Sequence, residues 1–377
     1  MKNKILIILF TLLLIQNVFS QKDLKIIKAN SEFADIRNGK EFGKGNWKIS
    51  PEISPDIFYT TAIGENLVFI TDLDSITIPI TELTDFDFIV LLKGKKKALT
   101  KIKYVESYLT KLKKASEYNN NDIRFIPKFT YQSNDNPSLI KIRQELKLDS
   151  IAGKGSELSK IFNLMHWVHN LVKHDGGSDN PTLKNAIDLI KICKSENRGV
   201  NCRMLATILN ECYLSLNIKS RHVTCMPKET EFEDCHVINM VYSTELEKWI
   251  WIDPTFDAYV MNEKGNLLGI EEVRDRLITG QPLVLNADAN WNREYLKTKE
   301  EYLENYMAKN LYRFLTPLVS EYDSETVKKD KEIVYVELLP LDGIVQTPQM
   351  EETNNKTGVK FINYKTNNPK IFWNKPE

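Results

Sequence analysis

Apolar positions in the first third of the chain come in short runs that are rich in β-branched and aromatic residues. The runs at 67–71, 75–80 and 86–92 are separated by short polar segments that contain Asp. This pattern is typical of β-strands joined by turns. It predicts a small antiparallel β-sandwich within a β-rich region over residues 21–130. The basic run at 93–97 is interpreted as a solvated turn between strands, in preference to a binding patch for glycans or phosphate.

After a polar linker at 134–137, apolar residues recur at spacings of three and four, which is the period of an α-helix. Ser156 is suited to cap one helix, and Asn180 followed by Pro181 is suited to start another. The pattern predicts helices at 137–148, 157–173, 180–193 and 202–217.

From Ser220 onward the period changes to two, which indicates β-strands. Strands are predicted at 220–225, 235–243 and 248–253, with a short turn between the last two. Helices followed by strands with short turns are typical of an α+β domain with an antiparallel sheet. The remaining pattern predicts a helix from about residue 291, a strand at 333–339 and a polar tail from residue 345.

The first 20 residues show the three-part pattern of a secretory signal peptide. Two lysines precede an apolar run at 5–15, and a more polar end places Val18 and Ser20 just before a cleavage point. The apolar run is short for a bilayer crossing, although an uncleaved anchor is the alternative interpretation. We expect export to the periplasm or the extracellular space, with no stable membrane insertion after cleavage.

These patterns predict an α+β fold class, with helices packed on an antiparallel sheet and a small β-sandwich-like domain in front. A fragment that begins near residue 135 is expected to keep the helical core folded. The predicted divisions are a signal peptide (1–20), a β-rich N-terminal domain (21–130), a central α+β domain (135–290) and a C-terminal helical and β extension (291–377).

Composition and charge narrow the function classes. Hydrophobic residues make up 42% and charged residues 27% of the 377 residues, as in a globular protein rather than a disordered one. The 51 Lys and Arg balance the 51 Asp and Glu, so the formal net charge is +0. Gross charge therefore gives no reason to expect a nucleic acid or an anionic membrane as a partner.

Candidate chemistry lies between residues 198 and 259, in the order Cys202, His236, Asp253. Cys202 is expected at a helix N-terminus, where unpaired N–H groups and the helix dipole favour the thiolate. His236 begins one predicted strand and Asp253 ends the next, so antiparallel pairing brings them together at one end of the sheet. This order suits a nucleophile, a base and a group that orients the base, as in acyl-transfer enzymes. The backbone N–H of Cys202 is a candidate donor to the oxyanion.

Residues 155–285 resemble the transglutaminase-like superfamily, which comprises cysteine enzymes of papain-like geometry. The resemblance rests on a Gly-x-x-Cys turn into a helix, an approximate Gly-Ile-x-x-Arg, a His-Val pair and the segment Trp-Ile-Asp-Pro-Thr. These motifs stand here at 199–202, 217–221, 236–237 and 251–255. Gly199 is expected to let the loop turn tightly into the helix.

The resemblance implies a role for each residue of the motifs. It makes Cys202 the nucleophile, His236 the base and Asp253 the orienting group, and it gives Arg221 a structural role. The chain departs from the family pattern in two places. Arg203 follows the cysteine where many relatives have a small or acidic residue, and Asn217 replaces the usual glycine.

The implied function is that of an exported cysteine enzyme that attacks an amide or peptide carbonyl and forms a thioester, without a cofactor or a metal. Hydrolysis is favoured over transfer to an amine, because no amine-binding motif is visible, and a protein or peptide is the expected substrate. The alternative is a non-catalytic cell-surface binding or scaffold protein that keeps the core for its shape. The substrate, the acyl acceptor and the second oxyanion donor stay open.

Metal binding is a weaker interpretation of the other histidines and cysteines. His166, His169 and His174 lie close together in sequence, but only Asp175 adds a nearby ligand. Cys225 and Cys235 could form a zinc site with His222 and His236. In a secreted chain a disulfide is the favoured interpretation. The predicted disulfides are Cys225–Cys235 and Cys193–Cys212, which leave Cys202 unpaired.

Overall fold

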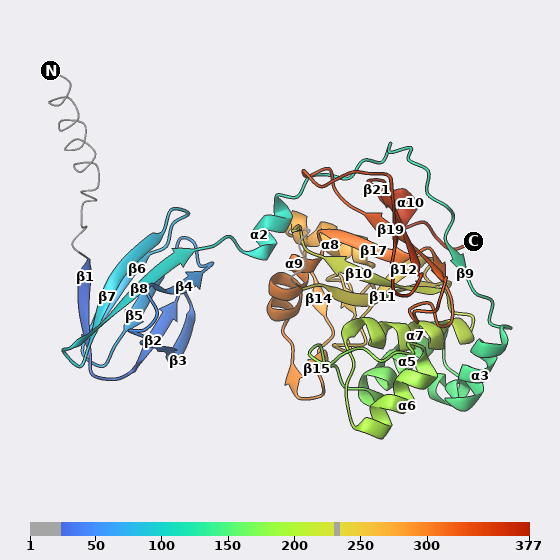
Figure 1. Cartoon of the computed structure of the whole chain (residues 1–377), viewed down its shortest axis with the longest axis horizontal. Helices are drawn as coiled ribbons and strands as arrows, with labels where there is room; N and C mark the ends of the chain where they lie inside the picture. Colours follow the sequence, from blue (N-terminus) through green and yellow to red (C-terminus); the bar gives the residue numbers. More distant parts are fainter. Residues whose placement is uncertain (1–23, 230–233) are drawn as a thin grey trace, which may run out of the picture. The chain divides into compact units, whose positions relative to one another are not determined.

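The computed structural model describes residues 24–229 and 234–377 and divides the chain into two compact units, Met1–Ser107 and Tyr108–Glu377 (Figure 1). The predicted signal peptide lies outside the described residues. The boundary falls earlier than the expected one near residue 130, because Leu112 is already buried in the core of the second unit. Within the described ranges, no helix combines the length and the hydrophobicity that a membrane crossing requires.

The first unit is a β-sandwich-like domain of two four-stranded sheets, ordered β1-β7-β8-β4 and β3-β2-β5-β6. One core joins the sheets, and in it Phe69 and Phe88 meet edge to face at 5.2 Å. The first sheet is mixed rather than antiparallel as predicted, because β1 and β4 run parallel to their neighbours. The strands are β1 (Lys25–Ala29), β2 (Phe33–Asn38), β3 (Glu41–Lys48), β4 (Asp56–Thr60), β5 (Asn66–Ile70), β6 (Ser75–Pro79), β7 (Asp85–Leu92) and β8 (Lys96–Tyr104).

A seven-stranded sheet of order β12-β11-β10-β17-β19-β21-β20 forms the centre of the second unit. The three predicted central strands are confirmed as β10, β11 and β12, and they pair antiparallel. Strands from the last third of the chain continue this sheet, since Leu315 of β17 pairs with Thr224 of β10. The segment 291–377 therefore contributes to the central domain. The strands are β10 (Ser220–Met226), β11 (His236–Ser243), β12 (Lys248–Ile252), β17 (Arg313–Pro317), β19 (Glu332–Leu338), β20 (Gln349–Thr353) and β21 (Lys360–Thr366).

Each face of this sheet has its own hydrophobic core, because alternate residues of a strand point to opposite faces. In β12, Trp249 and Trp251 join one core, and Ile250 and Ile252 join the other. Helices α3–α7 cover the Ile face, and α7 packs on β10 and β11 (Figure 1). These helices are α3 (Pro137–Glu145), α4 (Leu148–Ala152), α5 (Glu157–Leu171), α6 (Ala186–Glu196) and α7 (Cys202–Ser215).

The Trp face is covered by shorter elements, mostly from the last third of the chain. The helix predicted from residue 291 begins only at Glu300 and opens as a π-helix. Before it, Asn292 and Arg293 have φ values of 54° and 64°, which a right-handed helix does not allow. The elements are α2 (Tyr108–Lys113), α8 (Ile270–Thr279), η1 (Glu300–Met307), α9 (Ala308–Asn310), α10 (Pro369–Phe372) and the paired short strands β9 (Thr130–Tyr131) with β18 (Val319–Ser320), β13 (Val260–Met261) with β14 (Val284–Leu285), and β15 (Asn290–Trp291) with β16 (Tyr295–Leu296).

The helix boundaries show which local signals the sequence analysis interpreted correctly. Helix α7 begins at Cys202 as predicted, and the side chain of Asn201 accepts from the N–H of Met204. Helix α6 begins at Ala186, so the start predicted at Pro181 is wrong; Asn185 is the N-cap instead. The helix predicted at 137–148 is split into α3 and α4, because Lys147 lies in the left-handed region with φ 54°.

Candidate active site

Cys202 is the first residue of α7, where the chain passes from a loop into the helix. The first N–H groups of a helix have no acceptor inside the helix, so this position favours a thiolate. Gly199 in the preceding loop is not in the left-handed region. A Cβ there would lie 2.6 Å from the backbone oxygen of Lys173 and 2.7 Å from Cβ of Asp175. Glycine is therefore needed for close contact with the segment 173–175, and not for a tight turn as predicted.

His236 and Asp253 lie at the same end of the sheet. The antiparallel register pairs Ser243 with Lys248 near the turn and leaves His236 and Asp253 at the far ends of β11 and β12. Nε2 of His236 lies 2.7 Å from Oδ2 of Asp253, and the two side chains are 1% and 0% exposed. The buried carboxylate thus fixes the orientation of the imidazole ring.

Asp253 is itself held by two further donors. The hydroxyl of Tyr302 donates to Oδ2 at 2.6 Å, and the N–H of Thr255 donates to Oδ1 at 2.8 Å. The indole N–H of Trp251 donates in turn to the hydroxyl of Tyr302 at 3.1 Å. A carboxylate with this many donors stays in one position and presents one oxygen to the imidazole.

Cys202 and His236 interact closely enough for each side chain to shift the pKa of the other. With Nε2 occupied by Asp253, Nδ1 is the ring nitrogen left for the thiol, and the hydroxyl of Tyr306 lies 3.2 Å from it. The rings of Phe256 and Tyr306 meet the imidazole edge to face, with centroids 5.5 Å and 5.2 Å away. The structure thus brings together the three residues that the sequence analysis selected, in the spatial order thiol, imidazole, carboxylate.

The environment of Cys202 favours the thiolate. Burial acts to raise the pKa of the thiol, but hydrogen bonds with His174 and His236 and the charge of His236 outweigh it and lower the pKa to about 6. Burial acts to lower the pKa of His236, but the charge of Asp253 and its hydrogen bond raise that pKa to about 10. Between these two values the pair exists as thiolate and imidazolium.

All five cysteines lie in the described part of the chain, and all five are free, so both predicted disulfides are wrong. In the strand pair β10–β11, Cys225 lies opposite His236 rather than opposite Cys235. Successive residues of a strand point to opposite faces, so this register directs Cys225 and Cys235 apart. Cys193 and Cys212 are buried as small apolar side chains in the core beneath α6 and α7. For the other four cysteines burial outweighs all other effects and raises the pKa, in the case of Cys235 to about 11.

Each of the other histidines has its own polar neighbours. Nδ1 of His166 lies 2.6 Å from Oδ2 of Asp257, and buried His169 lies between the carbonyl of Pro254 and the side chain of Asn290. Nε2 of His222 lies 3.1 Å from Glu325. Across the residues that the structure describes, no three His, Cys, Asp or Glu side chains are grouped as a metal site would require.

Arg203, which departs from the family pattern, turns away from the thiol into an ionic cluster. Its guanidinium lies 3.3 Å from Oε1 of Glu325 and donates to the hydroxyl of Thr224 at 2.8 Å. The hydroxyl of Tyr335 donates to the same Glu325 oxygen at 3.2 Å. Burial acts to raise the pKa of Glu325, but the charge of Arg203 and the bond with His222 bring it well below its usual range. Arg203 is therefore held by Glu325 and Thr224.

Two other residues that the sequence analysis singled out have structural explanations. Arg221 is fully buried, with its guanidinium 3.7 Å from the ring centroid of Phe129 and one N–H donating to the carbonyl of Phe372 at 3.0 Å. Asn217 has a φ of 61° just after α7. This left-handed position favours glycine, and asparagine is among the few other residues that adopt it readily.

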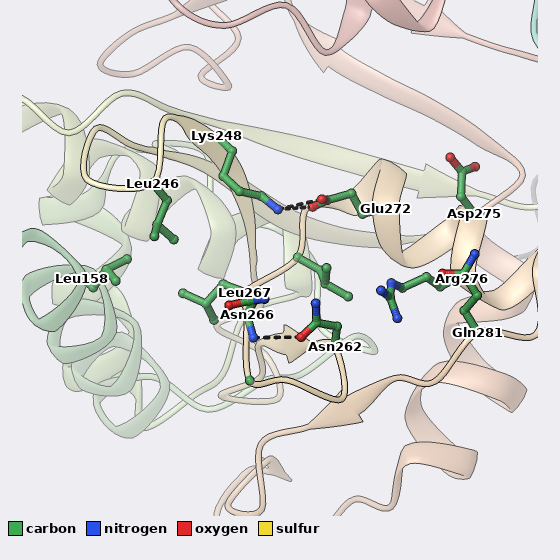
Figure 2. A pocket seen from close by; sticks show the side chains of 12 residues that line it. Leu158, Leu246, Lys248, Asn262, Asn266, Leu267, Glu272, Asp275, Arg276 and Gln281 are labelled. Atoms are coloured by element: carbon green, nitrogen blue, oxygen red, sulfur yellow. Dashed lines mark hydrogen bonds and ion pairs between the residues drawn. The ribbon is translucent and has the colours of Figure 1, made fainter.

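Two cavities differ in their relation to this site. One of about 280 Å³ adjoins the candidate residues and is lined by Phe256, Trp291, Lys297, Glu301, Tyr302 and Tyr306. Another of about 620 Å³ is lined by residues of α5, α8 and the loops beside β12 and β13 (Figure 2). There Lys248 pairs with Glu272 at 2.7 Å, and Cys202, His236 and Asp253 are not among the described lining residues. These three residues are not among the described lining residues of the smaller cavity either, but Tyr302 and Tyr306 in its wall contact Asp253 and His236. The smaller cavity is therefore the one that adjoins the candidate residues.

Several residues around the thiol were not predicted to belong to the site. Tyr302 and Tyr306 are four apart on η1 and so share one helix face, but the sequence analysis predicted only a helix there. His174 was considered only as a metal ligand, and Trp291 was not singled out. No local motif marks these residues, because they reach the site from segments outside the four motifs.

Residues 144–254 match the family model of the transglutaminase-like superfamily. This match covers the segment that carries Cys202, His236 and Asp253, so this part of the chain is a transglutaminase-like core. The match confirms the resemblance that the four motifs indicated. No curated protein matches the chain at a significant level.

Matching solved structures include one described as a cysteine protease and one described as a transglutaminase. A candidate cysteine protease from Cytophaga hutchinsonii is 24% identical over 31% of this chain and 37% of its own, with a TM-score of 0.25. Red sea bream transglutaminase is 11% identical over 64% of this chain and 50% of its own, with a TM-score of 0.23. The chain thus spans half or less of the length of each, and TM-scores this low support no inference about substrate or activity.

Proposed function

We propose that this chain is an exported cysteine enzyme that cleaves amide or peptide bonds through a thioester at Cys202. The observation that carries the proposal is the placement of His236 between the thiol and the carboxylate of Asp253, with Nε2 2.7 Å from Oδ2. Such an arrangement supplies both a nucleophile and a proton donor at neutral pH. Protein or peptide is the proposed substrate class, and the signal-like first 20 residues support export.

In the acylation step, the Cys202 thiolate forms a C–S bond with the carbonyl carbon, and the carbonyl electron pair moves to the oxygen. His236, held as imidazolium by Asp253, then transfers its proton to the leaving nitrogen. The C–N bond breaks, an amine leaves and the thioester remains. The hydrogen bond to Asp253 keeps the imidazole oriented through both proton transfers.

Deacylation requires an acceptor, and water is the proposed one. Neutral His236 removes a proton from water, the hydroxide adds to the thioester carbon, and the C–S bond breaks to return the thiolate. A primary amine could take the place of water in the same step. Incubation with casein and a fluorescent primary amine distinguishes the two. The amine that leaves in acylation is the same in both cases, but only transfer attaches the fluorescent amine to casein, whereas hydrolysis leaves an unlabelled carboxylate.

Iodoacetamide labelling at pH 7, followed by peptide mass spectrometry, tests the enzyme proposal directly. Cys235 is a matched internal control, since Cys202 and Cys235 are both partly exposed and the other three cysteines are buried. With pKa values of about 6 and about 11, Cys202 is almost wholly thiolate at pH 7 and Cys235 is almost wholly thiol. Allowing for the lower nucleophilicity of a low-pKa thiolate, Cys202 is expected to react roughly tenfold to a hundredfold faster.

The variant His236→Ala should abolish this advantage, and Cys202→Ala should leave a folded protein without turnover. If Cys202 instead reacts as slowly as Cys235, or equally fast with and without His236, the proposal fails. The non-catalytic scaffold then becomes the better description of the chain.

A further inference from the structure

A second histidine acts on the Cys202 thiol. The side chain of His174 lowers the pKa of Cys202, as that of His236 does, and its backbone lies beside the loop that leads into Cys202. His174 lies in the segment after α5 that forms a β-bridge with Val200, two residues before Cys202. The N–H of Val200 donates to the carbonyl of Lys173 at 3.1 Å, and the N–H of Asp175 donates to the carbonyl of Val200 at 2.8 Å. These hydrogen bonds join the segment 173–175 to the loop that leads into Cys202.

The backbone of His174 is also fixed from its other side. Oδ1 of Asn292 accepts from the N–H of His174 at 2.7 Å, and Nδ2 of Asn292 donates to its carbonyl at 3.0 Å. One buried amide thus satisfies both backbone groups of the histidine. This clamp comes from the hairpin β15–β16, more than a hundred residues further along the chain.

The adjacent residue of the same hairpin sets the tautomer of the ring. The indole N–H of Trp291 donates to Nδ1 of His174 at 3.2 Å. An indole nitrogen has a hydrogen to give and no lone pair to accept with, so Nδ1 of His174 must be the acceptor. The ring hydrogen is then on Nε2, and Nε2 is the only ring atom that can donate toward Cys202.

The two histidines beside the thiol therefore have opposite partners. His236 has a carboxylate at Nε2, which favours the imidazolium, whereas His174 accepts the indole N–H of Trp291 at Nδ1. With its hydrogen on Nε2, the ring of His174 is a hydrogen-bond donor of defined direction. It is poorly suited to act as a second base toward Cys202, because Nε2 already carries the hydrogen and the lone pair of Nδ1 accepts from Trp291.

Attack by the thiolate places negative charge on the carbonyl oxygen, and this oxyanion needs fixed donors close to the sulfur. The N–H of Cys202, the first of α7, has no acceptor within the helix and supplies one. We propose that His174 supplies the other, with its Nε2–H held toward the oxyanion by Trp291. His174 is then a catalytic residue, and Trp291 is a positioning residue that acts through it. This inference rests on the proposed function and adds to it the donor that sequence reasoning left open.

The test compares two reagents on the full-length protein. p-Nitrophenyl acetate acylates Cys202 through an oxyanion, whereas iodoacetamide alkylates the same thiolate without forming one. For each variant, both rate constants are measured across pH and compared at their pH-independent limits, so that a changed thiolate fraction cancels. Wild type is compared with His174→Ala, His174→Gln, Trp291→Phe and His166→Ala, the last being a control histidine that pairs with Asp257 instead.

We expect His174→Ala to lower the limiting acylation rate about 10²- to 10³-fold, as for the loss of one oxyanion donor, and to change alkylation less than about threefold. His174→Gln, which keeps an N–H donor, should recover most of the acylation rate. Trp291→Phe should give an intermediate loss in acylation alone, and His166→Ala should change neither rate. A merely structural role for His174 would not separate the two reagents or respond to glutamine.

Several outcomes would overturn the proposal. One is a parallel fall in acylation and alkylation in His174→Ala, and another is an unchanged acylation rate. A wild type that is alkylated rapidly but acylated no faster than free cysteine also rejects it, because no oxyanion is then stabilised. Failure of the proposed function looks different, since the wild-type Cys202 would then alkylate as slowly as an ordinary thiol.

Discussion

Tyr302 donates its hydroxyl to Oδ2 of Asp253 at 2.6 Å, the same oxygen that lies 2.7 Å from Nε2 of His236. The tyrosine is 1% exposed and also accepts the indole N–H of Trp251. Through this bond η1, which lies outside the matched family region, helps to set the position of the imidazole. The site therefore depends on residues beyond the four motifs.

Tyr302→Phe should reduce the acylation rate of Cys202 about tenfold to a hundredfold, because an orienting carboxylate loses one of its donors. It should also lower the free energy of unfolding by about 1–3 kcal/mol, since Trp251 and Asp253 each lose a buried partner. Acylation by p-nitrophenyl acetate and urea denaturation measure the two effects. Tyr213→Phe is the matched control, because Tyr213 is equally buried and its hydroxyl donates to the carbonyl of Ile161 in the other core. Equal losses in both variants would contradict this role for Tyr302.

The comparison between sequence and structure explains why Tyr302 was missed while the triad candidates were found. Cys202, His236 and Asp253 each stand at the end of a regular element, and local periodicity located those ends within one or two residues. The proximity of His236 and Asp253 was predicted from the antiparallel pairing of two neighbouring strands. Tyr302 and Trp291 reach the site through non-local packing, which leaves no period in the sequence. The same limitation hid the pairing of β17 with β10. The Cys225–Cys235 prediction failed because it used sequence spacing without the strand register, which pairs Cys225 with His236.

The pH dependence of acylation should follow the thiolate of Cys202. With a pKa of about 6 for Cys202, the rate should rise with pH up to a plateau that begins near 7 and lacks the usual inflection near 8.5. Turnover of an amide substrate should fall again above about pH 10, where His236 loses the proton that the leaving amine requires. Stopped-flow acylation between pH 5 and 11 measures the first limb. In His236→Ala the inflection should move up toward that of an ordinary thiol; an unmoved inflection would mean that His236 does not stabilise the thiolate.

Gly199→Ala should damage both the loop and the thiol position. The added Cβ would meet the backbone oxygen of Lys173 at 2.6 Å, and backbone cannot move aside as a flexible side chain can. We expect a loss of about 1–3 kcal/mol in the free energy of unfolding, as for other overpacked sites, and slower acylation of Cys202. Gly177→Ala is the matched control, because its Cβ would have only an ordinary contact, 3.5 Å from Asp175. Thermal denaturation measures the stability of the two variants. Equal stability would show that Gly199 is not packed against the segment 173–175 as described.

The segment between the two units should be required for the second one to fold. Leu112 is fully buried in the core on the Trp face, and β9 pairs with β18. Phe129 covers the guanidinium of Arg221 at 3.7 Å. A fragment 135–377 loses all three interactions and leaves a buried cation without one of its aromatic neighbours, which costs several kcal/mol by analogy with other unpaired buried charges.

We therefore expect fragment 108–377 to unfold in one cooperative thermal transition, and fragment 135–377, which the sequence pattern suggested would fold, to be insoluble or to show no transition. Circular dichroism with near-ultraviolet detection suits this test, because Trp249 and Trp251 lie in the core that the missing segment covers. Fragment 24–107, with its own core around Phe69 and Phe88, serves as the positive control for independent folding. A cooperative transition of 135–377 within a few degrees of that of 108–377 would show that residues 108–134 only line the surface. The second unit would then begin near residue 135, as the sequence pattern predicted.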